Sequence, residues 1–85
     1  MRHRTSDPTN ARAYVLIEAE TGQLDTVVAA LRRLPHVVAA DAVIGPYDVI
    51  ALIETSDPRV IGRLVIDEFH GISGVKRTTT CLAVQ

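Results

Sequence analysis

Apolar residues recur with two different periods along the chain. In three stretches they fill every second position or more, which is typical of β-strands, and in two they recur every third or fourth position, as in amphipathic helices. A fourth strand is indicated near the end of the chain, where three consecutive threonines favour an extended backbone. Leu24, Val27, Val28 and Leu31 form the clearest helical stripe. The predicted elements are strands over 12–20, 37–44, 47–54 and 74–85, a helix from 24 that Pro35 stops, and a helix that begins at Ser56-Asp57-Pro58 and ends at His70-Gly71.

The stretch Ile44–Glu54 is the most apolar part of the chain and predicts the centre of the fold. It opens with Gly45-Pro46, a pair that marks a tight turn because Pro fixes φ and lacks an N–H. The element order is therefore β-α-β-β-α-β, which is the ferredoxin-like arrangement of the α+β class. Short connections and right-handed crossovers predict an antiparallel sheet in the order 4-1-3-2, with both helices on one face.

Two helices cover one face of such a sheet, yet the first three predicted strands are apolar on both faces. An uncovered apolar surface of that size is an association site. The sequence thus predicts a homodimer packed sheet against sheet, a dimeric α/β barrel. A charge introduced at Leu16 or Leu52 should break this dimer or unfold the chain, depending on which face each side chain occupies.

Composition narrows the class of protein. The chain has 85 residues, 47% of them apolar, and a formal net charge of −1. This excludes a disordered chain and gives no electrostatic reason to expect nucleic acid as a partner. One cysteine, Cys81, precludes an internal disulfide and favours a reducing cytoplasm. No apolar run approaches the roughly 20 residues needed to cross a bilayer, so we expect a cytoplasmic domain without membrane contact.

Residues 1–11 have a different character from the rest. They are polar and include the basic cluster Arg2, His3 and Arg4. One interpretation is an arm that contacts phosphate, and the other, which we favour, is a frayed terminus, because termini not tied into a sheet are usually disordered. We therefore predict a disordered tail over 1–11 and a single domain over 12–85.

Patterns that would indicate an enzyme or a metal site are absent from the sequence. There is no Gly-rich phosphate loop, no Cys-x-x-Cys and no His-Glu-x-x-His. The histidines and Cys81 fall on unrelated elements, so we predict no metal, no cofactor and no catalytic residue. Cys81 is most simply a small buried hydrophobe. His70, near Asp67 and Glu68, is explained by the preference of helix C-termini for cations, with proton transfer as the alternative.

Asp48 is the one conspicuous polar residue of the central stretch. A buried carboxylate without donors would cost several kcal/mol. It either accepts hydrogen bonds from neighbouring backbone and fixes the turn, or it faces a subunit boundary and receives a ligand ammonium. In the second case loop N–H groups and the hydroxyls of residues 78–80, all threonine, could receive a carboxylate. The residues alone leave the two interpretations equal.

Three segments together resemble a known family. The helix end Leu31–Val37, the turn Gly45-Pro46-Tyr47-Asp48 and the closing segment Gly74–Thr80 are similar to the effector-binding domain of Lrp/AsnC transcriptional regulators. The resemblance covers residues 12–84. It implies dimers that join into rings, such as an octamer, and a small amino-acid effector bound where dimers meet. The ligand-binding positions it implies are Gly45, Pro46, Tyr47, Asp48, Thr78 and Thr80.

The resemblance also implies a mode of action. Family regulators carry a helix-turn-helix domain ahead of this one, and 11 tail residues cannot form it. We therefore expect a stand-alone sensing and oligomerisation module that binds no DNA itself and can assemble with a full-length Lrp/AsnC regulator. Pro46 lies where the family varies, and its missing N–H could alter effector contacts. The alternatives are a dimeric α/β-barrel enzyme, with Tyr14 or Tyr47 in its cavity, and a purely structural oligomerisation module.

Overall fold

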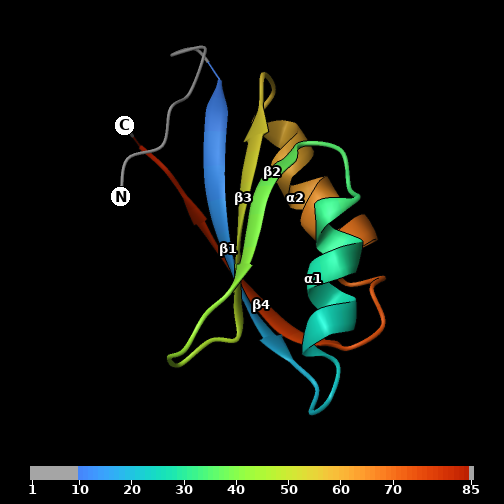
Figure 1. Ribbon diagram of the computed structural model, residues 1–85. Coiled ribbons are helices and arrows are strands. Elements are labelled where there is room, and N and C mark those ends of the chain that lie inside the picture. The colour runs from blue at the N-terminus through green and yellow to red at the C-terminus, as the bar shows by residue number, and fades with distance from the viewer. Residues whose placement is uncertain (1–9, 85) are drawn as a thin grey trace.

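The computed structural model describes residues 10–84 and has the predicted β-α-β-β-α-β order (Figure 1). The predicted tail over 1–11, with its basic cluster, lies outside the described residues except for Asn10 and Ala11, and Ala11 already pairs with Thr55. The elements are β1 (Ala11–Ala19), α1 (Leu24–Arg32), β2 (Val37–Ala42), β3 (Val49–Thr55), α2 (Arg59–Leu64), a one-turn π-helix η1 (Val65–Phe69) and β4 (Val75–Leu82).

The four strands form one antiparallel sheet in the order β2-β3-β1-β4. This is the predicted order 4-1-3-2 read from the other end. Both helices lie on the same side of the sheet (Figure 1). The fold class, the sheet order and the one-sided helical layer are therefore confirmed.

Pairing of β1 with β3 decides which side chains share a face. Val15 lies opposite Ala51 and Leu16 opposite Ile50, so alternate residues of both strands point to opposite sides. The strand residues that face the helices, which we call the helix-facing set, form one buried core with the apolar face of each helix. The largest fully buried side chains of this core are Val15, Ile17, Val27, Leu31, Val49, Ile53 and Phe69. Burying each contributes about 1.5–3 kcal/mol relative to exposure.

None of the helices formed by residues 10–84 lies on the opposite face of the sheet (Figure 1). We call it the open face; it includes Tyr14 and Leu16 of β1 and Ile50 and Leu52 of β3, which pair as Tyr14 with Leu52 and Leu16 with Ile50. Leu52 is only 4% exposed even in the single chain. Leu16 and Leu52 thus occupy the same face, which the sequence left undecided.

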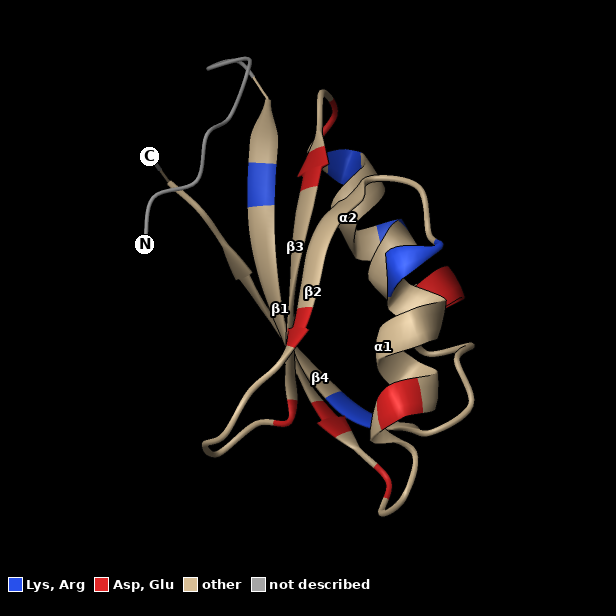
Figure 2. Ribbon diagram, in the orientation of Figure 1, with Lys and Arg blue, Asp and Glu red and all other residues tan. Residues whose placement is uncertain are grey.

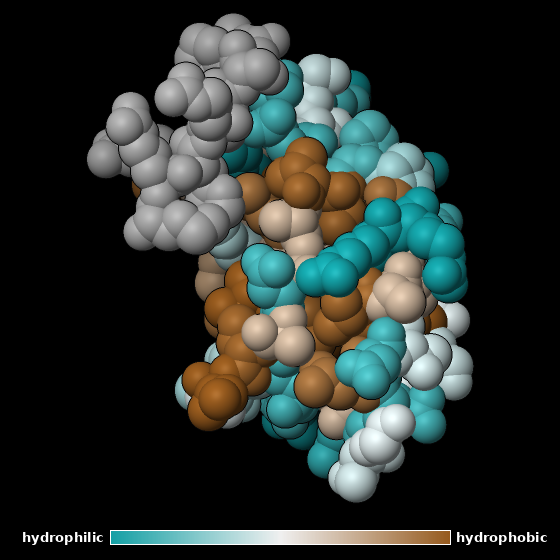
Figure 3. Space-filling view, in the orientation of Figure 1, coloured by the Kyte–Doolittle hydropathy of each residue, from teal (hydrophilic) through white to brown (hydrophobic). Residues whose placement is uncertain are grey.

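The strands beside the turn are shorter than predicted. The pattern predicted strands over 37–44 and 47–54, but β2 ends at Ala42 and β3 begins at Val49, which leaves 43–48 as a loop. The loop is closed by a 2.9 Å hydrogen bond from Val43 N–H to the Asp48 carbonyl. Ile44 is fully exposed, and the loop lies at the lower left of the molecule, where Figure 3 shows apolar surface. Pro46 has no N–H to offer to a ladder.

Cys81 corrects one expectation. It is exposed rather than buried, because β4 is an edge strand and Cys81 pairs with Tyr14 on the open face. The predicted helix start is correct to within one residue: α2 begins at Arg59, directly after Pro58, and Asp57 Oδ1 accepts the Arg59 N–H at 3.0 Å. The Arg59 side chain hydrogen-bonds the same carboxylate and, with that backbone bond, holds the pKa of Asp57 below its usual value.

Candidate functional site

The loop over 43–48 delivers Asp48 to the end of strand β1. Register between β1 and β3 stops at Ile17 opposite Val49, so β3 offers no strand partner to Ala19. Instead Asp48 Oδ2 accepts the Ala19 N–H at 2.8 Å, and the Asp48 N–H donates to the Ile17 carbonyl at 2.9 Å. The carboxylate thereby replaces a missing ladder acceptor at the point where the pairing of β1 with β4 shifts register, between Glu18 and Ala19.

These contacts support the first of the two interpretations of Asp48, in which it fixes the turn. They leave the second open, since a carboxylate has two oxygens and can accept several hydrogen bonds. Asp48 and Tyr47 are half-buried, while Gly45 and Pro46 are exposed. The amino-acid-binding role of these four residues stays a prediction.

Thr78 and Thr80 lie on β4, which flanks β1 on the side away from β3. Thr78 pairs with Ile17 and Thr80 with Val15, both residues of the helix-facing set. Asp48 and Thr78 therefore bracket Ile17 from opposite sides, about two strand spacings or roughly 10 Å apart. Thr80 lies two positions further along β4, away from the loop. The structure thus brings Thr78 nearer to Asp48 than Thr80.

His70 is the polar partner of Thr78 that the sequence did not reveal. Its Nε2 lies 2.9 Å from Thr78 Oγ1, which joins the end of η1 to β4. Side-chain spacing along α2 gives no signal of this contact, because it depends on how the helix end approaches the sheet. Thr79, between the two predicted site residues, pairs with Leu16 of the open face and so points away from His70.

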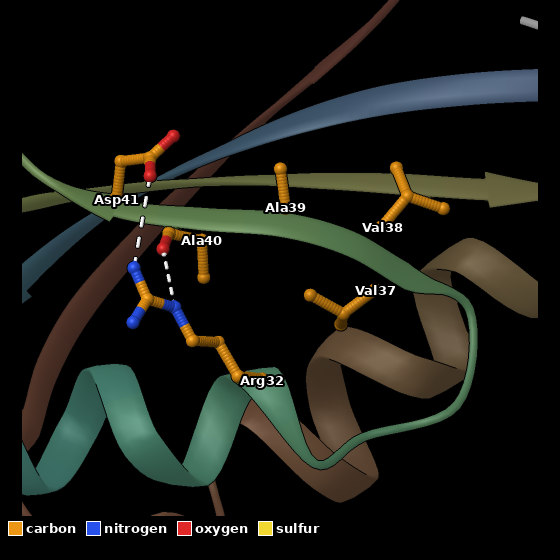
Figure 4. Close-up of a pocket in the computed structure, with 6 residues that line it drawn as sticks. All are labelled: Arg32, Val37, Val38, Ala39, Ala40 and Asp41. Atoms are coloured by element: carbon orange, nitrogen blue, oxygen red, sulfur yellow. Dashed lines mark hydrogen bonds and ion pairs between the residues drawn. The ribbon is translucent and has the colours of Figure 1, made fainter.

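A hollow of about 230 Å³ lies along the edge strand β2, lined by Arg32 and residues 37–41 (Figure 4). Arg32 reaches from α1 to donate through Nε to the Ala40 carbonyl at 2.9 Å, and its guanidinium lies 3.7 Å from Asp41. Figure 4 draws both contacts as dashed lines, and Figure 2 shows basic residues at the end of α1 and an acidic residue at the end of β2. A second hollow, of about 290 Å³, is lined by Asp57, Arg59, Val60 and Arg63. None of the predicted site residues lines either hollow.

Within residues 10–84, no three His, Cys, Asp or Glu side chains gather closely enough to hold a metal ion. No helix in that range combines the length and the apolar character that a membrane crossing needs.

Comparison with known sequences gives a consistent match. Residues 12–85 match the family model described as the Lrp/AsnC ligand binding domain. A relative from Pyrococcus horikoshii, described as the uncharacterized HTH-type transcriptional regulator PH1916, is 32% identical over 74 residues, which cover 84% of this chain and 49% of that protein. The chain spans about half the length of the curated relatives it matches.

Solved structures share the fold. The crystal structure of TTHA0845 from Thermus thermophilus matches with a TM-score of 0.84 at 32% identity, over 88% of this chain and 94% of that chain. The complex of the transcriptional regulator NMB0573 with L-Met, from Neisseria meningitidis, matches with a TM-score of 0.83 over 100% of this chain and 59% of that chain. At 15% identity, this second likeness shows the fold alone.

Proposed function

The chain belongs to the Lrp/AsnC ligand binding domain family, and from this premise we propose that it senses a small amino acid and acts on transcription through its assembly. The family match over residues 12–85 is the observation that carries the proposal. A fold neighbour solved with L-Met supports an amino acid as the class of effector. The relatives named as transcriptional regulators support a regulatory role rather than an enzymatic one. In this proposal the protein acts in the cytoplasm.

In this proposal the effector ammonium binds the Asp48 carboxylate, beside Gly45, Pro46 and Tyr47 of the same loop. Asp48 Oδ2 already accepts the Ala19 N–H, which holds the side chain in place. The second carboxylate oxygen can accept further hydrogen bonds. The effector carboxylate binds the hydroxyls of Thr78 and Thr80. Asp48 and Thr78 stand on opposite sides of β1 in one chain, which supports a site completed by residues of a second subunit.

Assembly begins at the open face. Tyr14, Leu16 and Ile50 form a half-buried apolar surface on the open face, next to the buried Leu52, and a second copy packed sheet to sheet would remove the rest of this surface from water. We propose this homodimer as the basic unit and a ring of dimers, such as an octamer, as the effector-binding form.

In this proposal, DNA is bound by another segment or another chain, and not by the described residues. Both α1 and α2 of the described residues pack on the same side of the sheet and are separated in sequence by two strands, so they do not form a helix-turn-helix pair. The match to 94% of the TTHA0845 chain supports a domain that works at about this size. A full-length Lrp/AsnC regulator that assembles with it would then read the DNA.

A thermal-shift screen of each standard amino acid, with particle size measured by light scattering, tests the proposal. A ligand at about ten times its Kd adds about 1.4 kcal/mol and raises the Tm of a domain this small by roughly 5–10 °C. We expect one chemical class of amino acid to give such a shift in the wild type and none in Asp48→Ala. A folded oligomer that no amino acid stabilises would contradict the proposal.

A further inference from the structure

The second helix ends in an unusual way. After α2 the backbone widens into η1, and the His70 N–H donates to the Val65 carbonyl, five residues back, at 3.1 Å. π-turns of this kind are rare and occur frequently at functional sites, because they act as a one-residue insertion that re-aims the side chains that follow. Here Phe69 remains fully buried, while the next residue, His70, is exposed.

The exposed histidine meets the sheet at one specific residue. His70 Nε2 lies 2.9 Å from Thr78 Oγ1, across the gap between the helix end and β4. Thr78 is half-buried and its backbone pairs with Ile17, the residue whose carbonyl also accepts the Asp48 N–H. His70 is thus connected through one hydroxyl to the strand position that faces Asp48 across β1.

A threonine hydroxyl has one hydrogen to donate and two lone pairs to accept with. If Nε2–H of His70 donates to Oγ1, the hydroxyl hydrogen is left to point elsewhere, toward an external acceptor. If Nε2 instead accepts, the hydroxyl hydrogen is consumed inside the protein and Thr78 presents only lone pairs, which a carboxylate cannot use. The state of His70 therefore decides whether Thr78 can bind an anionic group.

We propose that His70 is a positioning residue of the effector site, which donates through Nε2–H to Thr78 and so turns the Thr78 hydroxyl into a donor for the effector carboxylate. The inference rests on the proposed function and deepens it, since it names a residue outside the loop and β4 that sets the site's specificity for a carboxylate. His70 does not touch the effector and acts only through Thr78.

The test is a double-mutant cycle on effector affinity, with each standard amino acid titrated singly by calorimetry. His70→Phe keeps the ring shape and removes the donor, His70→Gln keeps a side-chain N–H donor, and Thr78→Val removes the hydroxyl. We expect His70→Phe and Thr78→Val each to weaken binding by about ten- to a hundredfold, the value of one hydrogen bond to a charged group. The double variant should be no weaker than Thr78→Val alone, and His70→Gln should restore most of the affinity.

Matched controls separate this role from a structural one. Thr79→Val changes the neighbouring hydroxyl on the opposite face of β4, and we expect it to leave affinity unchanged. Thermal melts of every variant confirm that each is folded. If His70→Phe binds like the wild type, or if its effect adds fully to that of Thr78→Val, the inference is wrong while amino-acid sensing stands. If the wild type binds no amino acid, the proposed function fails first and the inference falls with it.

Discussion

Replacing Asp48 by Asn and by Ala separates its two roles. Asn keeps a side-chain oxygen that can accept the Ala19 N–H but loses the negative charge, whereas Ala loses both. The hydrogen bond is short, at 2.8 Å, and joins a carboxylate to a half-buried backbone amide. Hydrogen bonds to charged groups contribute about 1.5–3 kcal/mol, and removing one partner leaves the other unsatisfied.

We therefore expect Asp48→Ala to lower the free energy of unfolding by about 2 kcal/mol, and Asp48→Asn by about 1 kcal/mol or less. At a urea slope of about 1 kcal/mol per M for a small domain, the midpoints should fall by about 2 M and by less than about 1 M, respectively. Far-ultraviolet circular dichroism suits the measurement, because the chain contains no Trp. All samples need one protein concentration, since assembly also stabilises the folded state.

The affinity for the effector should depend on the negative charge of Asp48 rather than on its hydrogen bond with Ala19. Removing one partner of a desolvated ion pair costs about 2–5 kcal/mol, so both variants should lose at least about thirtyfold in affinity. Asp48→Asn that binds an amino acid as tightly as the wild type would refute the ammonium-binding role. Asp48→Ala with an unchanged urea midpoint would refute the structural role derived from the contact with Ala19.

Four further substitutions test the fold and the assembly. Gly74→Ala should cost about 2–4 kcal/mol in urea unfolding, because φ is +99° and the new Cβ would lie 2.7 Å from a side-chain carbon of Gln23. Gly62→Ala in α2, with open space around it, should instead gain about 0.5–1 kcal/mol; equal midpoints for the two would contradict this expectation. Leu16→Glu places a charge on the open face and should yield a folded monomer by sedimentation velocity, and an intact dimer would show that this face is not the interface. Because the pKa of Asp57 is lowered, its hydrogen bonds with Arg59 stabilise the fold at pH values above 3.8, the ordinary pKa of this carboxyl group. This stabilisation is lost as the pH falls through the pKa of Asp57 in the folded state. The Tm difference between wild type and Asp57→Ala should therefore vanish in acid, and a difference that persists below both values would refute it.

Much of the fold could be predicted because the strand period and the helix period of the apolar residues were easy to tell apart. The stripe Leu24, Val27, Val28 and Leu31 fits only one helical face, and three of the four are buried as expected. The faces of the strands could not be assigned, since β1 is apolar at both even and odd positions, and only its register with β3 places Val15 against the helices and Leu16 on the open face. Such a pattern defines a strand without defining its orientation.

The candidate site was less accessible to sequence reasoning. Asp48 was recognised as a polar exception, but its partner Ala19 is 29 residues away and becomes its neighbour only through strand pairing. The contact between His70 and Thr78 depends on the π-turn, which the spacing of the apolar residues of the second helix does not reveal. The apolar run also extends through Ile44, although the chain has already left the sheet there, because loop geometry rather than hydrophobicity ends β2.

Two-dimensional amide NMR of the assembled protein, titrated with each standard amino acid, tests the central claim most directly. The account predicts that one class of amino acid shifts the amide signals of Ala19, Asp48 and Thr78 together, because these residues border the proposed site. Signals that no amino acid moves, or shifts confined to the surface around Asp57 and Arg63, would contradict amino-acid sensing at this site.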